Sequence, residues 1–178
     1  MKTLIIYTSQ TGFTKKYAGW IAERTDADLM TLKEARKKDA GFFGGYDAIV
    51  YGGWTMAGTV VSLKWFLDKA AAWKDKRLAL FCVGGSPNDN PEVEVMLRRL
   101  LTDEQRQYIA AFYCQGGFNY EKMNIASRLA MKMFVGNLKK KKNASGDEKK
   151  MAEMISSSYD ISDISYTDPI VEYLKSGK

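Results

Sequence analysis

The stretch Thr8-Ser9-Gln10-Thr11-Gly12-Phe13-Thr14 decides the fold that this sequence predicts. The apolar run before it, residues 2–7, is typical of a buried strand, and residues 14–24 after it have the apolar spacing of a helix. The first amides of a helix are unpaired and lie at the positive end of the helix dipole. A polar turn that joins a strand to such a helix therefore predicts an anion-binding site.

The donors that this turn offers are neutral. Ser9, Thr11 and Thr14 supply hydroxyl groups, Gly12 lets the backbone approach a ligand closely, and the turn holds no lysine or arginine. The ATP-binding pattern that ends in Gly-Lys-Ser/Thr is missing, and so is the dinucleotide pattern Gly-x-Gly-x-x-Gly. A second interpretation needs no ligand: Thr11 or Thr14 lies near the cap of an ordinary helix.

Strand patterns alternate with helical patterns in the first part of the chain, whereas the charged residues 34–39 predict a surface loop or turn. Continuous apolar strands that alternate with helices predict a parallel sheet covered on both faces. Because crossovers of this kind are right-handed, the expected strand order is 2-1-3-4-5, that of a doubly wound α/β fold. The five predicted strands cover residues 2–7, 28–32, 47–51, 77–83 and 109–114.

Ligands of such sheets bind beyond the carboxyl ends of the strands, and two further strand ends there have unusual sequences. Glycines in both let backbone amides reach a flat ligand. Trp54 and Met56 offer polarisable apolar surface for a ring, although Trp54 could instead be a core residue. Ser86, Asn88 and Asp89 suit a polar ring edge. The second end comprises Gly53, Trp54, Thr55, Met56, Ala57 and Gly58, and the third comprises Gly84, Gly85, Ser86, Asn88 and Asp89.

Ser9, Thr11, Gly12 and Thr14 match the flavodoxin phosphate loop Ser/Thr-x-Thr-Gly-x-Thr, and the three strand ends together resemble the FMN site of flavodoxins. The resemblance covers residues 1–117 and implies a flavodoxin-like five-stranded sheet with FMN as cofactor. The other two loops would flank the isoalloxazine ring. The phosphate would bind among Ser9, Gln10, Thr11, Gly12, Phe13 and Thr14.

The sequence departs from carrier flavodoxins in its third loop and at Phe13, and it lacks the carboxylates that response-regulator receivers need. The third loop has no aromatic residue, and Phe13 replaces a small polar residue, so ring stacking and redox potential are expected to differ. Receivers need carboxylates at the first and third strand ends, where this chain has Thr8 and Gly52. A flavodoxin-fold interaction module without flavin is kept as an alternative.

The tail narrows the functional prediction. Residues 116–123 and the closing Tyr166-Thr167-Asp168 resemble segments of the flavodoxin-like protoporphyrinogen oxidase family. This resemblance implies an FMN-dependent oxidoreductase that passes electrons between a small-molecule substrate, such as a porphyrinogen, and a second redox partner. A small electron-transfer flavodoxin is the alternative. The chain is expected to form one domain, 1–178, in which residues 118–160 are a helical extension or insertion.

The segment 123–142 predicts one long helix with an apolar side that packs on the domain. Its last four residues are Lys139, Lys140, Lys141 and Lys142. We favour a solvated helix end for these lysines over peripheral contact with an anionic membrane, and we expect no nucleic-acid partner. The apolar side carries Ala126, Leu129, Met133 and Phe134.

Composition restricts the chemistry further. The 178 residues include no histidine and two cysteines, Cys82 and Cys114, both in apolar strand patterns. These features exclude Ser-His or Cys-His catalysis and predict no metal site. Carrier flavodoxins tend to be acidic, whereas this chain has a net charge of +6. A positive charge suits a substrate that bears carboxylates. Among polar side chains, Asp89, Tyr120 and Lys122 are candidates for acid–base roles, and no catalytic residue is assigned.

The sequence also gives an expectation of location. It has no apolar run long enough to span a bilayer, and no signal peptide pattern precedes the first strand. A cytoplasmic protein is the simplest interpretation, with peripheral association at the inner membrane face as its extension. The oligomeric state is not predicted.

Overall fold

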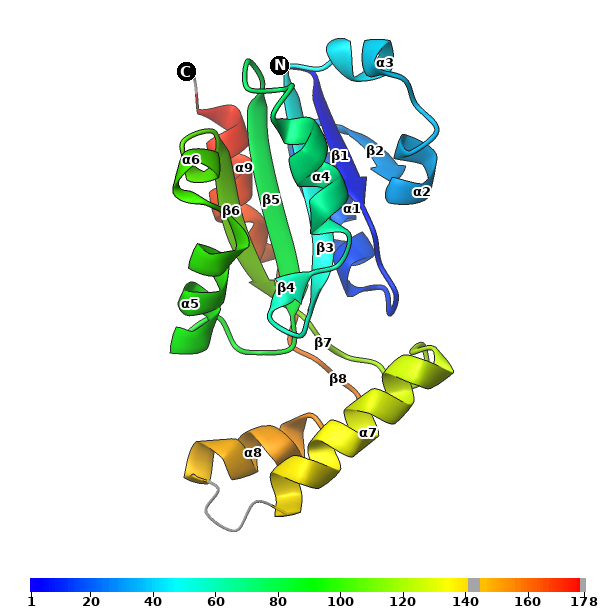
Figure 1. The fold of residues 1–178 in the computed structure, drawn as a ribbon, viewed down its shortest axis with the longest axis vertical. Coiled ribbons are helices and arrows are strands. Elements are labelled where there is room, and N and C mark those ends of the chain that lie inside the picture. Colours follow the sequence, from blue (N-terminus) through cyan, green and yellow to red (C-terminus); the bar gives the residue numbers. More distant parts are fainter. Residues whose placement is uncertain (141–144, 177–178) are drawn as a thin grey trace.

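The computed structural model describes residues 1–140 and 145–176. Five parallel strands form a sheet in the order β2-β1-β3-β5-β6, and this confirms the predicted order of a flavodoxin-like fold (Figure 1). A two-residue strand, β4 (Thr59–Val60), pairs antiparallel with the end of β3. The parallel strands are β1 (Thr3–Tyr7), β2 (Asp28–Thr31), β3 (Ala48–Met56), β5 (Arg77–Gly84) and β6 (Ile109–Gln115).

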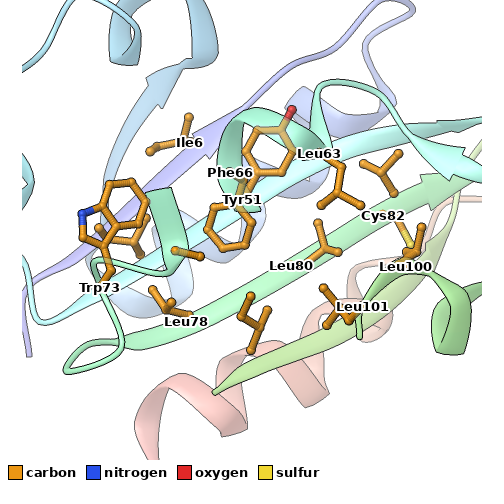
Figure 2. Packing of buried hydrophobic residues seen from close by; sticks show 14 of the residues in the cluster. Ile6, Tyr51, Leu63, Phe66, Trp73, Leu78, Leu80, Cys82, Leu100 and Leu101 are labelled. Atoms are coloured by element: carbon orange, nitrogen blue, oxygen red, sulfur yellow. The ribbon is translucent and has the colours of Figure 1, made fainter. Parts of the chain in front are cut away.

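Helices cover both faces of the sheet, as the apolar strands require. The face under α4 and α5 buries a cluster in which the Tyr51 and Phe66 rings stack with centroids 5.5 Å apart (Figure 2). The face under α1 and α9 buries a second cluster that includes Tyr17 and Phe81. We call the sheet and these helices the body. The helices are α1 (Phe13–Thr25), α4 (Leu63–Ala70), α5 (Pro91–Leu100) and α9 (Asp168–Lys175).

The prediction of a surface loop or turn at residues 34–39 is wrong in part, because one short helix includes residues 34 and 35 and another begins directly after residue 39. Helix α2 (Leu32–Ala35) begins with a capping box, in which Thr31 and Glu34 satisfy each other's backbone amides. Helix α3 (Ala40–Gly44) begins at Asp39, whose carboxylate accepts the Phe42 amide at 2.9 Å. Local capping therefore overrides the low apolar content of this stretch. A third short helix, α6 (Asp103–Arg106), precedes β6.

The strand predicted at residues 47–51 is longer in the structure, because β3 continues through Gly52 and Gly53. It runs to Met56 and folds back into β4 through a two-residue turn in which Ala57 and Gly58 have φ of 50° and 76°. Positive φ at both positions is the geometry that hairpin turns favour. Gly53 lies inside the strand, where a Cβ would lie 2.6 Å from Val60 Cγ1. Close packing against β4 explains this glycine.

After β6 the chain leaves the sheet along β7 (Gly117–Phe118) and returns along β8 (Tyr159–Asp160), which pairs antiparallel with β7. We call these two strands the ribbon. Between them lie α7 (Ile125–Lys140) and α8 (Gly146–Met154), the helical hairpin. A short helix, η1 (Ile164–Thr167), then leads into α9.

Helix α7 lies beyond the carboxyl ends of the strands and packs mainly on α8 (Figure 1). Three side chains of its expected apolar side, Leu129, Met133 and Phe134, are 59%, 62% and 48% exposed. The expectation that this side packs on the domain is therefore wrong. The physical reason is position, because a helix beyond the edge of the sheet meets no apolar sheet face.

Candidate functional site

The turn between β1 and α1 has the geometry of an uncapped helix start. Gly12 precedes the helix with φ of 105°, and no side chain caps the helix there. In the part of the chain that the structure describes, the amides of Phe13, Thr14 and Lys15 have no acceptor. The interpretation of Thr11 or Thr14 as an ordinary helix cap is therefore not supported. Unpaired amides at the positive end of a helix favour an anion.

Side chains of the turn divide into those that shape it and those that are free to bind. Ser9 Oγ accepts the Gly12 amide at 3.2 Å, which closes the turn. Gln10 Nε2 donates to Ser127 Oγ of α7 at 3.3 Å, so this amide is directed to the hairpin. Within the described residues, the hydroxyls of Thr11 and Thr14 have no hydrogen-bond partner. Thr11 is partly exposed, whereas Thr14 is 1% exposed, so an anion would meet the Thr14 hydroxyl only in contact with the helix start itself.

Phe13 packs on the chain that follows β6. A Cβ built at Gly117 would lie 3.0 Å from Phe13 Cζ, so the ring fills space beside the ribbon. Phe13 thus packs against the segment that is inserted after β6. Its side chain is committed to packing, so it is the unpaired backbone amide of Phe13 that remains for an anion.

The second predicted loop is a strand end with a tight turn. The Thr8 amide donates to Gly52 O at 2.9 Å, which holds this strand end next to the anion turn. Trp54 is half-buried and belongs to neither buried cluster, so the alternative of a core residue is not supported. Met56, the last residue of β3 before the turn into β4, is 57% exposed. Both side chains are therefore accessible beside the turn.

The third predicted loop is held from outside by side chains of later segments. Tyr113 Oη donates to Ser86 O at 2.8 Å, and Tyr159 Oη donates to Gly85 O at 2.8 Å. The backbone amide of Asn88 donates to Gln115 Oε1 at 2.9 Å, and the backbone amide of Gln115 donates to Asn88 Oδ1 at 3.0 Å. Asn88 therefore uses its side-chain oxygen to fix the loop, whereas Asp89 stays exposed.

Sequence reasoning missed the residues that hold this loop. Tyr113 and Gln115 alternate along β6 beside the loop, a period-two signal that could have identified them. Phe118 and Tyr159 meet through the ribbon, with ring centroids 5.5 Å apart. Strands β7 and β8 have two residues each and are separated in sequence by α7 and α8, so no sequence pattern predicts that they pair.

Other reactive side chains are poor candidates for chemistry. Tyr120 Oη donates to Ile155 O, directly after α8. Burial raises the pKa of the Cys82 thiol to about 12, which keeps it protonated, and Cys114 lies buried in the other cluster. Among the described residues, no group of histidine, cysteine, aspartate and glutamate side chains could hold a metal ion.

The family model described as "Flavodoxin domain" matches residues 4–145. The chain belongs to this family. FMN is the cofactor that the family implies, and the flavin-free alternative loses support accordingly. A comparison with curated proteins found no match.

Several solved structures are similar to this chain in fold. A WrbA-like flavodoxin from Agrobacterium tumefaciens is 23% identical with a TM-score of 0.44, over 71% of this chain and 87% of that one. Oxidised flavodoxin 2 from Bacillus cereus is 22% identical with a TM-score of 0.43, over 64% and 84%. Rubredoxin oxygen:oxidoreductase from Desulfovibrio gigas is 14% identical with a TM-score of 0.48, and the match spans 87% of this chain but 35% of that protein.

The residues at the carboxyl edge fit FMN. Its phosphate needs donors in a place without steric obstruction, and a Cβ built at Gly12 would have no heavy atom within 4 Å. The unpaired amides at the start of α1 and the unpaired threonine hydroxyls are donors of this kind. Its ring needs apolar surface next to the turn, and Trp54 and Met56 lie on the adjacent strand end.

Proposed function

We propose that this chain is an FMN-dependent oxidoreductase whose cofactor lies across the three strand ends. In this proposal the phosphate binds at residues 9–14. The isoalloxazine lies between residues 53–58 and residues 84–89. The observation that carries the proposal is the uncapped start of α1, whose free amides lie at the carboxyl edge of the sheet.

FMN supplies hydride or electron transfer when it is bound. The chain's own residues bind and orient it. Thr11 and Thr14 donate to the phosphate, the strand end at Trp54 covers one side of the ring, and the backbone of the third loop meets the polar edge. Neutral donors around the phosphate leave the local field to the helix dipole and to exposed lysines such as Lys15.

The identity of the bound flavin tests this proposal. Purified or reconstituted protein is denatured, and the released flavin is identified by chromatography. We expect FMN, because the turn serves one terminal phosphate and no adenine-binding pattern follows it. Release of FAD, or the lack of any saturable flavin binding, would refute the proposal.

For the reaction we propose oxidation of a carboxylate-bearing tetrapyrrole of the porphyrinogen type, with transfer of the electrons to a second acceptor. The support is the resemblance of residues 116–123 and of Tyr166-Thr167-Asp168 to the protoporphyrinogen oxidase family. Arg24 Nη1 donates to Thr167 Oγ1 and Asp168 Oδ1, both at 2.6 Å, so the closing segment anchors α9 to α1. Because this closing segment has a structural role, its resemblance supports the relation to that family more strongly than it supports the porphyrinogen substrate.

Anaerobic mixing decides between this reaction and a one-electron shuttle. The FMN-loaded protein is combined with protoporphyrinogen IX and a quinone, and porphyrin fluorescence is followed. A rate well above the uncatalysed control is expected. A rate equal to that control, with rapid electron exchange to a ferredoxin-type partner, would establish the electron-transfer flavodoxin instead.

We further propose that α7 contacts an anionic membrane surface. Ile125, Leu129 and Met133 are four residues apart, so they share one helix face, and they are 86%, 59% and 62% exposed. Exposed cations accompany this face at Lys132, Lys139 and Lys140. An apolar face with flanking cations is the pattern of a helix that lies in a membrane interface. Lys141 and Lys142, which belong to the same prediction, lie outside the described residues.

In the described ranges, 1–140 and 145–176, no helix has the length and apolar content to cross a bilayer. Sedimentation with vesicles of phosphatidylglycerol and phosphatidylcholine, at low and high salt, tests a peripheral contact. Met133→Glu should abolish binding, and Leu29→Glu, at a residue 42% exposed on β2, is the matched control on the body. Equal sedimentation of both variants would refute membrane contact through α7. Concentration-dependent dimers that Met133→Glu dissociates would assign the face to a second copy of the chain.

A further inference from the structure

We infer that Tyr159 is a positioning residue of the flavin site: through its hydrogen bond to Gly85, it holds the third loop in the shape that receives the isoalloxazine edge. This inference rests on the proposed function. It adds that the hairpin inserted after β6 returns a residue that completes the cofactor site.

The contact between ribbon and loop is close. Tyr159 Oη donates to Gly85 O at 2.8 Å. A Cβ built at Gly85 would collide with the Phe118 ring and would lie 2.8 Å from Tyr159 Oη. Both strands of the ribbon therefore press on the loop at this glycine, and any larger residue would displace them.

Fixing this carbonyl also directs the next amide. In a planar trans peptide the C=O and N–H groups point in opposite directions, and the described residues include no cis peptide. With Gly85 O directed to Tyr159, the Ser86 N–H points away from the ribbon. This N–H has no acceptor in the described part of the chain. It is thus a free, aimed donor for a carbonyl oxygen or ring nitrogen at the isoalloxazine edge.

Tyr159 remains a donor over the ordinary pH range. Burial raises the pKa of its hydroxyl above the usual value, with a smaller contribution from Tyr120, so it stays protonated at neutral pH. The other residues that hold the third loop, Tyr113 and Gln115, lie on β6 and are fixed by the sheet. Tyr159 belongs to the returning chain, so this part of the site forms only when the ribbon forms.

Tyr159→Phe tests the inference, and Tyr120→Phe is its matched control. Both substitutions remove one phenolic hydroxyl from the aromatic group around Phe118, but Tyr120 Oη donates to Ile155 O, directly after α8, and not to the third loop. Three quantities are measured: amide hydrogen exchange of the peptide spanning residues 85–89 in apoprotein, in which the hydrogen-bonded Asn88 amide carries the protection, the dissociation constants of FMN and riboflavin, and the thermal midpoint.

For Tyr159→Phe we expect faster exchange at residues 85–89 and roughly two- to tenfold weaker binding of both flavins, since one neutral hydrogen bond is lost. An equal loss for FMN and riboflavin distinguishes the ring end from the phosphate end, because riboflavin has no phosphate. Tyr120→Phe should leave exchange and both affinities unchanged. Thermal midpoints of the two variants should remain similar.

Unchanged exchange and unchanged flavin affinity in Tyr159→Phe would overturn the inference, as would equal losses in both variants. A loss of FMN affinity with unaltered riboflavin affinity would also overturn it. If the wild-type protein binds no flavin while Tyr159→Phe still exchanges faster, the FMN proposal fails and the hold on the loop stands. The arms of the experiment therefore separate the two claims.

Discussion

Helices α4 and α7 both carry apolar side chains at helical spacing, yet α4 buries Leu63 and Phe66 whereas α7 exposes Leu129 and Met133. Helix α4 lies across a sheet face that needs covering. Helix α7 lies beyond the edge of the sheet and packs mainly on α8. The difference teaches that amphipathic spacing predicts a helix with one apolar side, but the surrounding architecture decides what covers that side.

The largest expected effect is on stability, from one substitution made in each region. Phe66→Ala, at a fully buried ring (Figure 2), should lower the free energy of unfolding by about 3–5 kcal/mol, through lost burial and a new cavity. Phe134→Ala, at a ring 48% exposed, should change it by less than about 0.5 kcal/mol. Urea unfolding of apoprotein measures both. A large loss for Phe134→Ala would mean that α7 is covered in solution.

The next effect concerns ligand binding at the boundary between the two regions. Thr14→Val removes an unpaired hydroxyl from the body side of the anion turn and should weaken FMN binding roughly tenfold to a hundredfold. Thr11→Val should act in the same direction. Ser127→Ala removes the acceptor of Gln10 from α7 and should change affinity less than about threefold, because that contact is partly exposed.

Titration of apoprotein with FMN gives these affinities, and circular dichroism verifies that each variant is folded. If neither threonine variant binds more weakly, the phosphate lies elsewhere. A Ser127→Ala effect as large as that of Thr14→Val would show that the hairpin itself belongs to the phosphate site.

The smallest effects come from two ion pairs made by α1. Arg24 joins Asp168 at 2.6 Å and Thr167, so Arg24→Met should destabilise the body by about 1 kcal/mol, after allowance for side chains that are a third to half exposed. Lys16 joins Asp160 at the root of the hairpin, with both side chains about half exposed, and Lys16→Met should cost less than about 0.5 kcal/mol. Unfolding at low and high salt measures both, and a larger, salt-sensitive loss at Lys16 would reverse the comparison.

Much of the candidate site could be predicted from sequence because strand ends and glycine-rich turns are local features. The turn at residues 9–14 and the third loop lie where their preceding strands end. The end of β3 was placed too early, because the glycines looked like a break, whereas Gly53 packs against Val60 within the extended strand. A glycine required for close packing and a glycine required for a turn look the same in sequence.

The sequence by itself determined the strand order, the covering of both sheet faces and the position of the anion turn. Apolar period, chain length between strands and turn residues are local properties, and right-handed crossovers convert them into one topology. Only the tertiary structure decided that Tyr159 holds Gly85 and that the apolar side of α7 stays exposed. These outcomes depend on contacts, or on the lack of a covering surface, between segments far apart in the chain, and no local pattern encodes such distances.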